Sequence, residues 1–192
     1  MPFSKFRLNP QFYSEGINTG DLNRDGIQDV ISGPYWYPGP AFTQKLTFRA
    51  ARVAPFDTTG DSDCYAIFTF DFNKDGWLDI LSFRLPGGVE AVWYENPKGT
   101  GALWTFSPVT AKGTWGTFTH GIGAGDLNGD GRLDLIFPTG WWEQTTSATA
   151  VPWVQHSATF GGQANPSEAF GGAQIFAYDV DGDGDNDVVT SQ

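Results

Sequence analysis

Hydrophobic residues alternate with small or polar ones over several short stretches of the chain, and a period of two predicts β-strands. Four stretches share an isoleucine, a threonine or alanine two positions later, and then an acidic segment; the isoleucines are Ile17, Ile67, Ile122 and Ile175. A short apolar pair follows each acidic segment: Val30-Ile31, Ile80-Leu81, Leu135-Ile136 or Val188-Val189. The pattern predicts four hairpins, each with a polar loop between two strands. The recurring isoleucine and small residue also predict a strand face crowded by neighbouring units.

The four acidic segments share one nine-residue pattern. Side-chain oxygens recur at the first, third, fifth and ninth positions, and a glycine at the sixth allows a tight turn. Calcium takes six to eight oxygen ligands at about 2.3–2.6 Å, and the seventh residue can add its backbone carbonyl. We therefore predict calcium sites, with four ordinary polar turns as the alternative. The predicted ligands are Asp21, Asn23, Asp25, Ile27 and Asp29; Asp71, Asn73, Asp75, Trp77 and Asp79; Asp126, Asn128, Asp130, Arg132 and Asp134; and Asp179, Asp181, Asp183, Asp185 and Asp187.

The spacing of the segments indicates a repeat protein. Successive segments start 50, 55 and 53 residues apart, a period typical of repeated supersecondary units. A helical EF-hand is excluded, because it needs an acidic residue at position 12 and helices on both sides. Position 12 is Ser32, Ser82, Phe137 and Thr190 in the four segments.

A strand, an Asp-rich loop and a second strand about every 50 residues resemble the FG-GAP/VCBS family of calcium-binding β-propeller repeats. The segments 20–23, 124–131 and 178–185 carry the resemblance, which extends over nearly the whole chain. It implies four-stranded blades around a channel, with calcium loops between the first and second strands. It does not imply one function, because the family includes adhesion ectodomains, lectin-like modules and polysaccharide lyases.

We expect an all-β fold and a single β-propeller domain over 1–192. The expected blades span about 13–54, 64–109, 118–160 and 173–192, and residues 3–8 are a possible closing strand. The fourth blade has only two predicted strands, which would leave an unpaired sheet edge. We therefore expect about three complete blades and a partial fourth, in a piece of a larger propeller. The alternatives are closure of the last blade by residues 3–8 and self-association of two chains through their open edges.

Charge and composition narrow the function classes. The formal net charge is -11, and 14 of the 22 acidic residues lie in the four loops, so four calcium ions would bring the charge to -3. The chain lacks the basic stripe that nucleic-acid binding needs, and no apolar run is long enough for a membrane span. No signal peptide is visible, but calcium loops of millimolar-range affinity make most sense outside the cytosol. We expect a secreted or periplasmic protein whose export signal is absent from this sequence.

Aromatic residues supply the candidate ligand-binding groups. Trp36, Trp93, Trp141 and Trp142 recur in the predicted third strands, where they are either packing residues or flat platforms for sugar rings. Two of these strands continue alike, as Tyr94-Glu95-Asn96 and Trp142-Glu143-Gln144. The single cysteine, Cys64, is expected to be a small buried residue at the start of a strand.

Three function hypotheses remain. The favoured one is a non-enzymatic, calcium-stabilised binding module for a glycan or protein partner. The second is a polysaccharide lyase or hydrolase that uses Glu15, Asp63 or His120 near the channel mouth, since carboxylates and a histidine can perform acid–base catalysis. The third is a scaffold domain of a longer secreted protein.

Overall fold

The computed structural model describes residues 5–50, 54–84, 90–114, 121–146, 151–160 and 174–191. Fourteen strands form four separate antiparallel sheets, and the described residues contain no helix. The first sheet contains β1 (Ile17–Gly20), β2 (Asp29–Ser32), β3 (Tyr35–Tyr37) and β4 (Leu46–Thr47). The second contains β5 (Cys64–Phe70), β6 (Asp79–Arg84), β7 (Glu90–Glu95) and β8 (Thr105–Pro108). The third contains β9 (Gly123–Gly125), β10 (Asp134–Phe137), β11 (Gly140–Glu143) and β12 (Val154–Ser157), and the fourth contains β13 (Ile175–Tyr178) and β14 (Asp187–Thr190).

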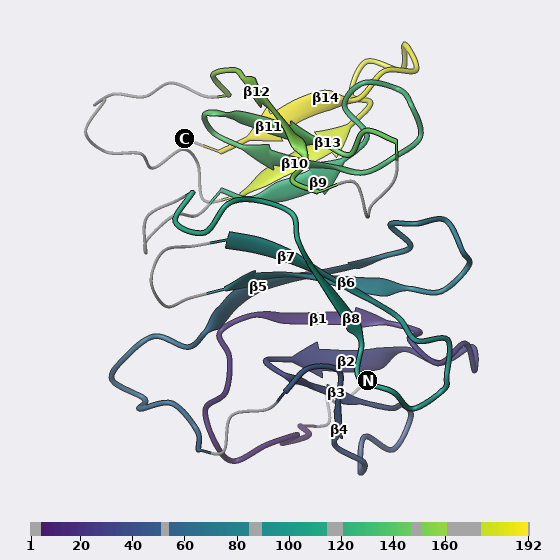
Figure 1. Ribbon diagram of the computed structural model, residues 1–192, viewed down its shortest axis with the longest axis vertical. Coiled ribbons are helices and arrows are strands. Elements are labelled where there is room, and N and C mark those ends of the chain that lie inside the picture. Colours follow the sequence, from purple (N-terminus) through teal and green to yellow (C-terminus); the bar gives the residue numbers. More distant parts are fainter. Residues whose placement is uncertain are drawn as a thin grey trace.

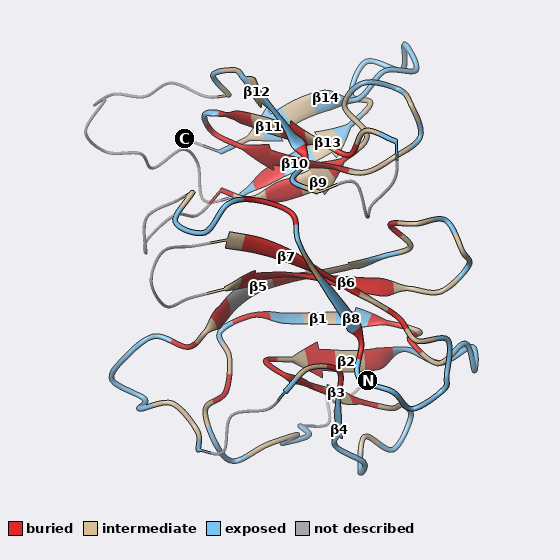
Figure 2. Ribbon diagram, viewed as in Figure 1, coloured by how far each residue is buried: buried red, intermediate tan, exposed pale blue. Residues whose placement is uncertain are grey.

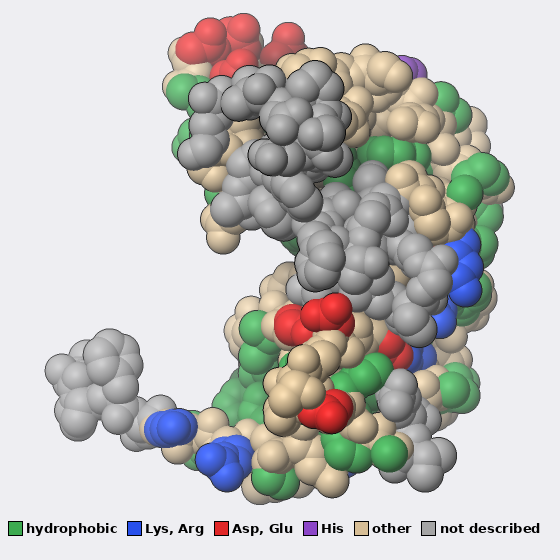
Figure 3. All heavy atoms as spheres, turned by 90° about the vertical axis from the view of Figure 1, so that its left-hand side faces the viewer, with side chains coloured by type: hydrophobic (Ala, Val, Ile, Leu, Met, Phe, Trp, Pro, Cys, Tyr) green, Lys and Arg blue, Asp and Glu red, His purple; other side chains and the backbone are tan. Residues whose placement is uncertain are grey.

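Every sheet is a simple meander in which each strand pairs with the next one in the chain. The all-β expectation and the four hairpins around the acidic segments are thus confirmed. The first three sheets lie one above another in chain order, from β1–β4 at one end (Figure 1). The fourth sheet overlaps the third in this view, and its strand β13 contacts β9. From the side, the row is curved and leaves a hollow on one side (Figure 3).

The first strands of the first and second sheets lie against one another, and so do those of the third and fourth sheets. The side-chain amide of Asn18 in β1 donates to the backbone oxygen of Ile67 in β5 at 2.7 Å. In return, the hydroxyl of Thr69 donates to the backbone oxygen of Thr19 at 2.7 Å. A Cβ built on Gly125 would stand 2.1 Å from the Cβ of Ala177. The crowding predicted from the small residues is therefore real at Thr69 and Ala177.

Two hydrophobic clusters lie between the first three sheets. The alternating faces of β6 serve both, because Ile80 points toward the first sheet while Leu81 and Phe83 point toward the third. All three side chains are fully buried, and burial of an aliphatic or aromatic side chain of this size stabilises the fold by about 1.5–3 kcal/mol. Figure 2 shows the buried positions concentrated in the inner parts of the first three sheets, whereas β14 alternates between exposed and half-buried positions.

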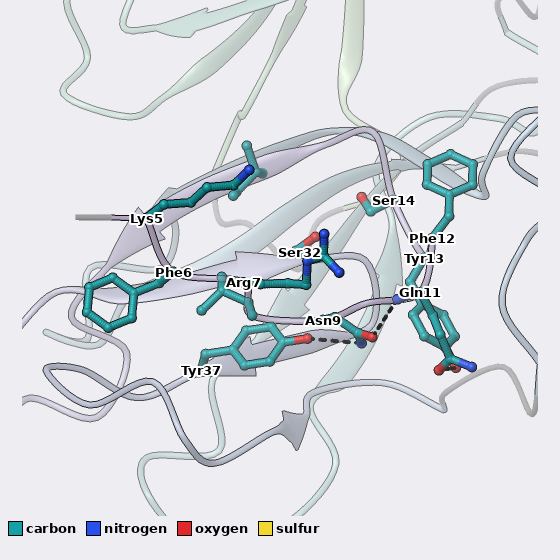
Figure 4. Close-up of a pocket in the computed structure, with 12 residues that line it drawn as sticks. Lys5, Phe6, Arg7, Asn9, Gln11, Phe12, Tyr13, Ser14, Ser32 and Tyr37 are labelled. Atoms are coloured by element: carbon teal, nitrogen blue, oxygen red, sulfur yellow. Dashed lines mark hydrogen bonds between the residues drawn. The ribbon is translucent and has the colours of Figure 1, made fainter. Parts of the chain in front are cut away.

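Two expectations need correction at the first sheet. Residues 5–8 are not a strand; Asn9 caps a turn by accepting a hydrogen bond from Gln11 N at 3.0 Å, and Pro10 lacks the N–H that a ladder needs. This segment instead lines a pocket of about 340 Å³ beside Tyr37 and Ile17 (Figure 4). Ile17 is 64% exposed, because no sheet of the described chain covers its side of β1. Residues 3 and 4 lie outside the described residues.

Candidate metal sites

The four acidic loops occupy equivalent places, because each one joins the first and second strands of a sheet, and all four lie on the same side of the row (Figure 1). In the first loop both oxygens of Asp21 accept backbone hydrogen bonds, from Asp25 N at 3.1 Å and Gly26 N at 2.9 Å. The side chain of Asp25 accepts one from Ile27 N at 2.9 Å. The glycine at position six has φ values of 83°, 88°, 77° and 98° in the four loops, a region where a side chain is strained. The second and third loops repeat these contacts.

The ninth-position carboxylate is the least expected part of the first three loops. Asp29, Asp79 and Asp134 are fully buried. Asp79 accepts one hydrogen bond from Phe72 N at 3.3 Å and another from Asn96 N, just after β7, at 2.8 Å. Burial raises the pKa of Asp79 to about 7 and that of Asp134 to about 6. This carboxylate therefore joins the start of the loop to the end of the third strand.

The fourth loop differs from the other three. Its ninth residue, Asp187, is exposed and accepts a hydrogen bond from Val180 N at 3.1 Å. Oxygens of Asp179, Asp181 and Asp187 all lie within 4.8 Å of one another, and the described residues contain no other such group of three acidic, histidine or cysteine side chains. Two ligands of one calcium ion, at about 2.3–2.6 Å each, lie at most about 5 Å apart. The donor set of this loop therefore fits a hard divalent cation.

Basic side chains from nearby positions reduce the negative charge at the loops. Lys98 Nζ lies 3.0 Å from Asp75 Oδ2, and Arg132 pairs with Asp130. The guanidinium of Arg24, in the first loop, lies 5.3 Å from the ring centroid of Trp77 in the second loop. Successive loops are thus in contact with each other.

Amide side chains connect each loop to the next sheet. Asn96 Nδ2 donates to Leu22 O in the first loop and to Leu78 O in the second, both at 2.9 Å. Gln144 Nε2 donates to Phe72 O in the second loop at 2.6 Å. Asn186 Nδ2 donates to Asp126 O in the third loop at 2.7 Å. This role was not predicted from the sequence, although the recurring aromatic-Glu-amide order was the signal for two of these residues.

The third-strand tryptophans divide into two groups. Trp93 is fully buried and Trp142 is 4% exposed, so the hypothesis that they are sugar platforms is wrong for both; they pack in the cluster between the second and third sheets. Trp36 and Trp141 are half-buried. Trp141 stacks on His156, with ring centroids 4.3 Å apart and planes 15° apart.

Two candidate catalytic carboxylates make inter-segment contacts. Glu15 accepts hydrogen bonds from the backbone and hydroxyl of Ser62. Asp63 forms a two-point ion pair with Arg49, at 2.7 and 3.1 Å. Cys64 is fully buried, as expected, and burial raises the pKa of its thiol. The third candidate, His120, lies outside the described residues.

Together these features define a repeat protein of antiparallel sheets with an acidic loop in the first hairpin of each. Residues 71–137, from the second loop to the end of β10, match the family model of the FG-GAP-like repeat. The chain thus contains a segment similar to that family, and no curated protein matches it. Within the described part of the chain, no helix is both long and apolar enough to cross a membrane.

Proposed function

We propose that the chain is a calcium-stabilised module of the β-propeller type that works by binding a glycan or protein partner outside the cytosol. The observation that carries this proposal is the common position of four Asp-rich hairpin loops along one side of a curved row of sheets. The FG-GAP-like match over residues 71–137 supports it, and so does the curvature of the row (Figure 3). Secretion or export to the periplasm is part of the proposal.

Calcium in this proposal is structural. Each loop carries three to five carboxylates, three of which converge in the fourth loop. In the second and third loops one carboxylate already has a basic partner. A bound cation would offset the remaining repulsion and hold the first and second strands of the sheet together. Because binding free energy adds to the free energy of unfolding, removal of the ion should loosen the hairpins.

A binding role is favoured over catalysis because two carboxylates considered for acid–base chemistry already hold other groups. Glu15 is bonded to Ser62, and Asp63 is paired with Arg49. The Glu15 contact joins the segment before β1 to the segment before β5. The Asp63 contact joins the segment after β4 to that same segment. Both contacts therefore have a structural role. A partner that is bound and not turned over would agree with this arrangement.

Thermal unfolding with and without calcium tests the proposal. We expect the melting temperature to fall when the protein is treated with a chelator and to return when calcium is restored, with magnesium as the control ion. Isothermal titration should show fewer bound ions for Asp130→Ala than for the unchanged protein.

A melting temperature that changes with neither chelator nor calcium would refute the structural role of the ion. Release of products from an acidic polysaccharide would instead favour the enzyme hypothesis.

A further inference from the structure

A pocket of about 380 Å³ lies between the first and second sheets, on the side of the first loop. Its aromatic walls are Trp36 from β3 and Trp104 from the segment before β8. Thr47 of β4 and Asn23 of the first loop also line it. The volume lies near the lower end of the range of small-molecule sites, about 300–1,000 Å³.

The equivalent tryptophan between the second and third sheets is buried. Trp93 pairs across its hairpin with Leu81 as Trp36 does with Ile31, but Trp93 is fully buried. Phe72 occupies the loop position of Leu22, and its ring centroid lies 6.3 Å from that of Trp153. Leu22 is smaller than Phe72, so it fills less of the first interface than Phe72 does of the second.

The residues just before the fourth strands, β8 and β12, make equivalent contacts at the two interfaces. Trp104 N donates to Phe48 O at 3.0 Å, and Trp153 N donates to Val109 O at 3.0 Å. Each of these tryptophans therefore ties the fourth strand of its sheet to the end of the preceding sheet. The open pocket is a local difference within a repeated frame, and the packing of Trp104 against Phe48 fixes its inner wall.

The lining indicates the chemistry of the ligand. None of the residues that line the pocket is ionisable, although the chain carries 22 acidic residues. One lining side chain contacts a carboxylate: Asn23 Nδ2 donates to Asp25 Oδ2 at 3.1 Å. Gly99 and Gly101 lack side chains, so backbone amides and carbonyls are accessible along one wall. An uncharged ligand with both C–H faces and hydroxyl groups suits such a site.

We infer that this pocket binds a neutral saccharide unit, with the half-buried ring of Trp36 stacked on a sugar face and with Thr47 and the glycine-rich wall forming hydrogen bonds to hydroxyls. This inference deepens the proposed binding function and rests on it. Flat aromatic surface contributes apolar contact while the polar edge groups set orientation. Since Asn23 belongs to the first acidic loop, an ordered loop also orders one wall of the pocket.

Titration with defined oligosaccharides tests the inference. The probes are cellotetraose, xylotetraose, mannotetraose, maltotetraose and chitotetraose, with tetragalacturonate as the charged counterpart, followed by tryptophan fluorescence and calorimetry at constant calcium. We expect saturable binding of at least one neutral probe and none of the uronate. Trp36→Ala should weaken that binding by about tenfold or more, as loss of a central tryptophan contact usually does.

Two further variants make the test specific. Trp141→Ala is the matched control, because Trp141 holds the same strand position in the third sheet and is also half-buried; it should bind within about twofold of the unchanged protein. Leu22→Phe copies the second repeat and should abolish binding by filling the pocket. Unchanged binding in Trp36→Ala, binding of the uronate alone, or no binding of any neutral probe would overturn the inference. If calcium stabilises the protein but no saccharide binds, the proposal of a calcium-stabilised binding module stands and only the saccharide inference fails. If a saccharide binds but calcium has no effect on stability, only the structural role of calcium is refuted.

Discussion

The side-chain amide of Asn96 donates a 2.9 Å hydrogen bond to the backbone oxygen of Leu22, a residue 74 positions earlier in the chain. The same amide reaches Leu78 O, and its own oxygen accepts from Lys98 N at 3.0 Å. One buried side chain thus joins the acidic loop of the first sheet, the acidic loop of the second sheet and the end of β7. Loss of such a residue leaves several buried polar groups without partners.

Asn96→Ala should therefore destabilise the protein strongly. Unpaired buried carbonyls cost about 1–3 kcal/mol each, so we expect a loss of about 2–4 kcal/mol and a melting temperature lower by about 5–10 °C. Chemical denaturation monitored by circular dichroism measures the change. Asn9→Ala is the control, because Asn9 bonds the Tyr37 hydroxyl at 3.3 Å near the surface. Equal effects of the two substitutions would refute the bridging role.

The metal-free protein should lose stability as the pH rises from about 4 to about 7. Burial raises the pKa of Asp79 to about 7 and that of Asp134 to about 6, from the ordinary aspartate value of 3.8. The folded state therefore holds protons that the unfolded state releases, and stability falls as these groups ionise. Urea denaturation in chelator at several pH values measures the slope. Asp79→Asn should flatten it, and so should calcium, because a cation favours the carboxylate form. A slope of the opposite sign would contradict the buried position of these groups.

Close packing of the first strands predicts a steric effect at Gly125. An added Cβ would stand 2.1 Å from the Cβ of Ala177, so Gly125→Ala must displace β13 from β9. Overpacking of this kind costs about 1–3 kcal/mol. Gly60→Ala is the matched control, because the nearest atom to an added Cβ there is Asp57 O at 3.9 Å, and its effect should stay within about 0.5 kcal/mol. Thermal unfolding of the two variants decides between them.

The fourth loop offers a test of which atoms bind the ion. Asp181→Ala removes one of three converging carboxylates and should lower the calcium stoichiometry by one. Asp185→Ala should leave it unchanged, because the seventh loop position contributes its backbone carbonyl. Calorimetric titration counts the sites. If Asp185→Ala loses an ion and Asp181→Ala keeps it, the ligand assignment in this loop is wrong.

Local pattern was sufficient to predict the hairpins, because each one is specified within about 15 residues by alternating strands and an Asp-Gly turn. Contacts between sheets were harder to foresee. The bonds from Asn96 to Leu22 and from Gln144 to Phe72 join positions more than 70 residues apart, and nothing in the local sequence identifies the acceptor. The burial of Trp93 depends likewise on the neighbouring sheet, whereas Trp36 in the same register remains partly open.

The contact between the ninth loop residue and the segment after the third strand could not be predicted from the sequence either. The repeating acidic pattern treats Asp29, Asp79, Asp134 and Asp187 alike. Their environments differ because only the first three meet the backbone amide of a third strand, from Gly39, Asn96 and Gln144 respectively. The described residues provide no third strand beside β14, so Asp187 is left at the surface.

The exposure of Ile17 at one end of the row and of Val189 at the other implies a gradient of local opening along the molecule. In a row of repeats each unit is stabilised mainly by its interfaces with its neighbours. The outermost units, which have one such interface, therefore open locally before the middle ones. Amide protons of β14 should then exchange with solvent fastest, and those of β6, enclosed on both faces, should be the last to exchange.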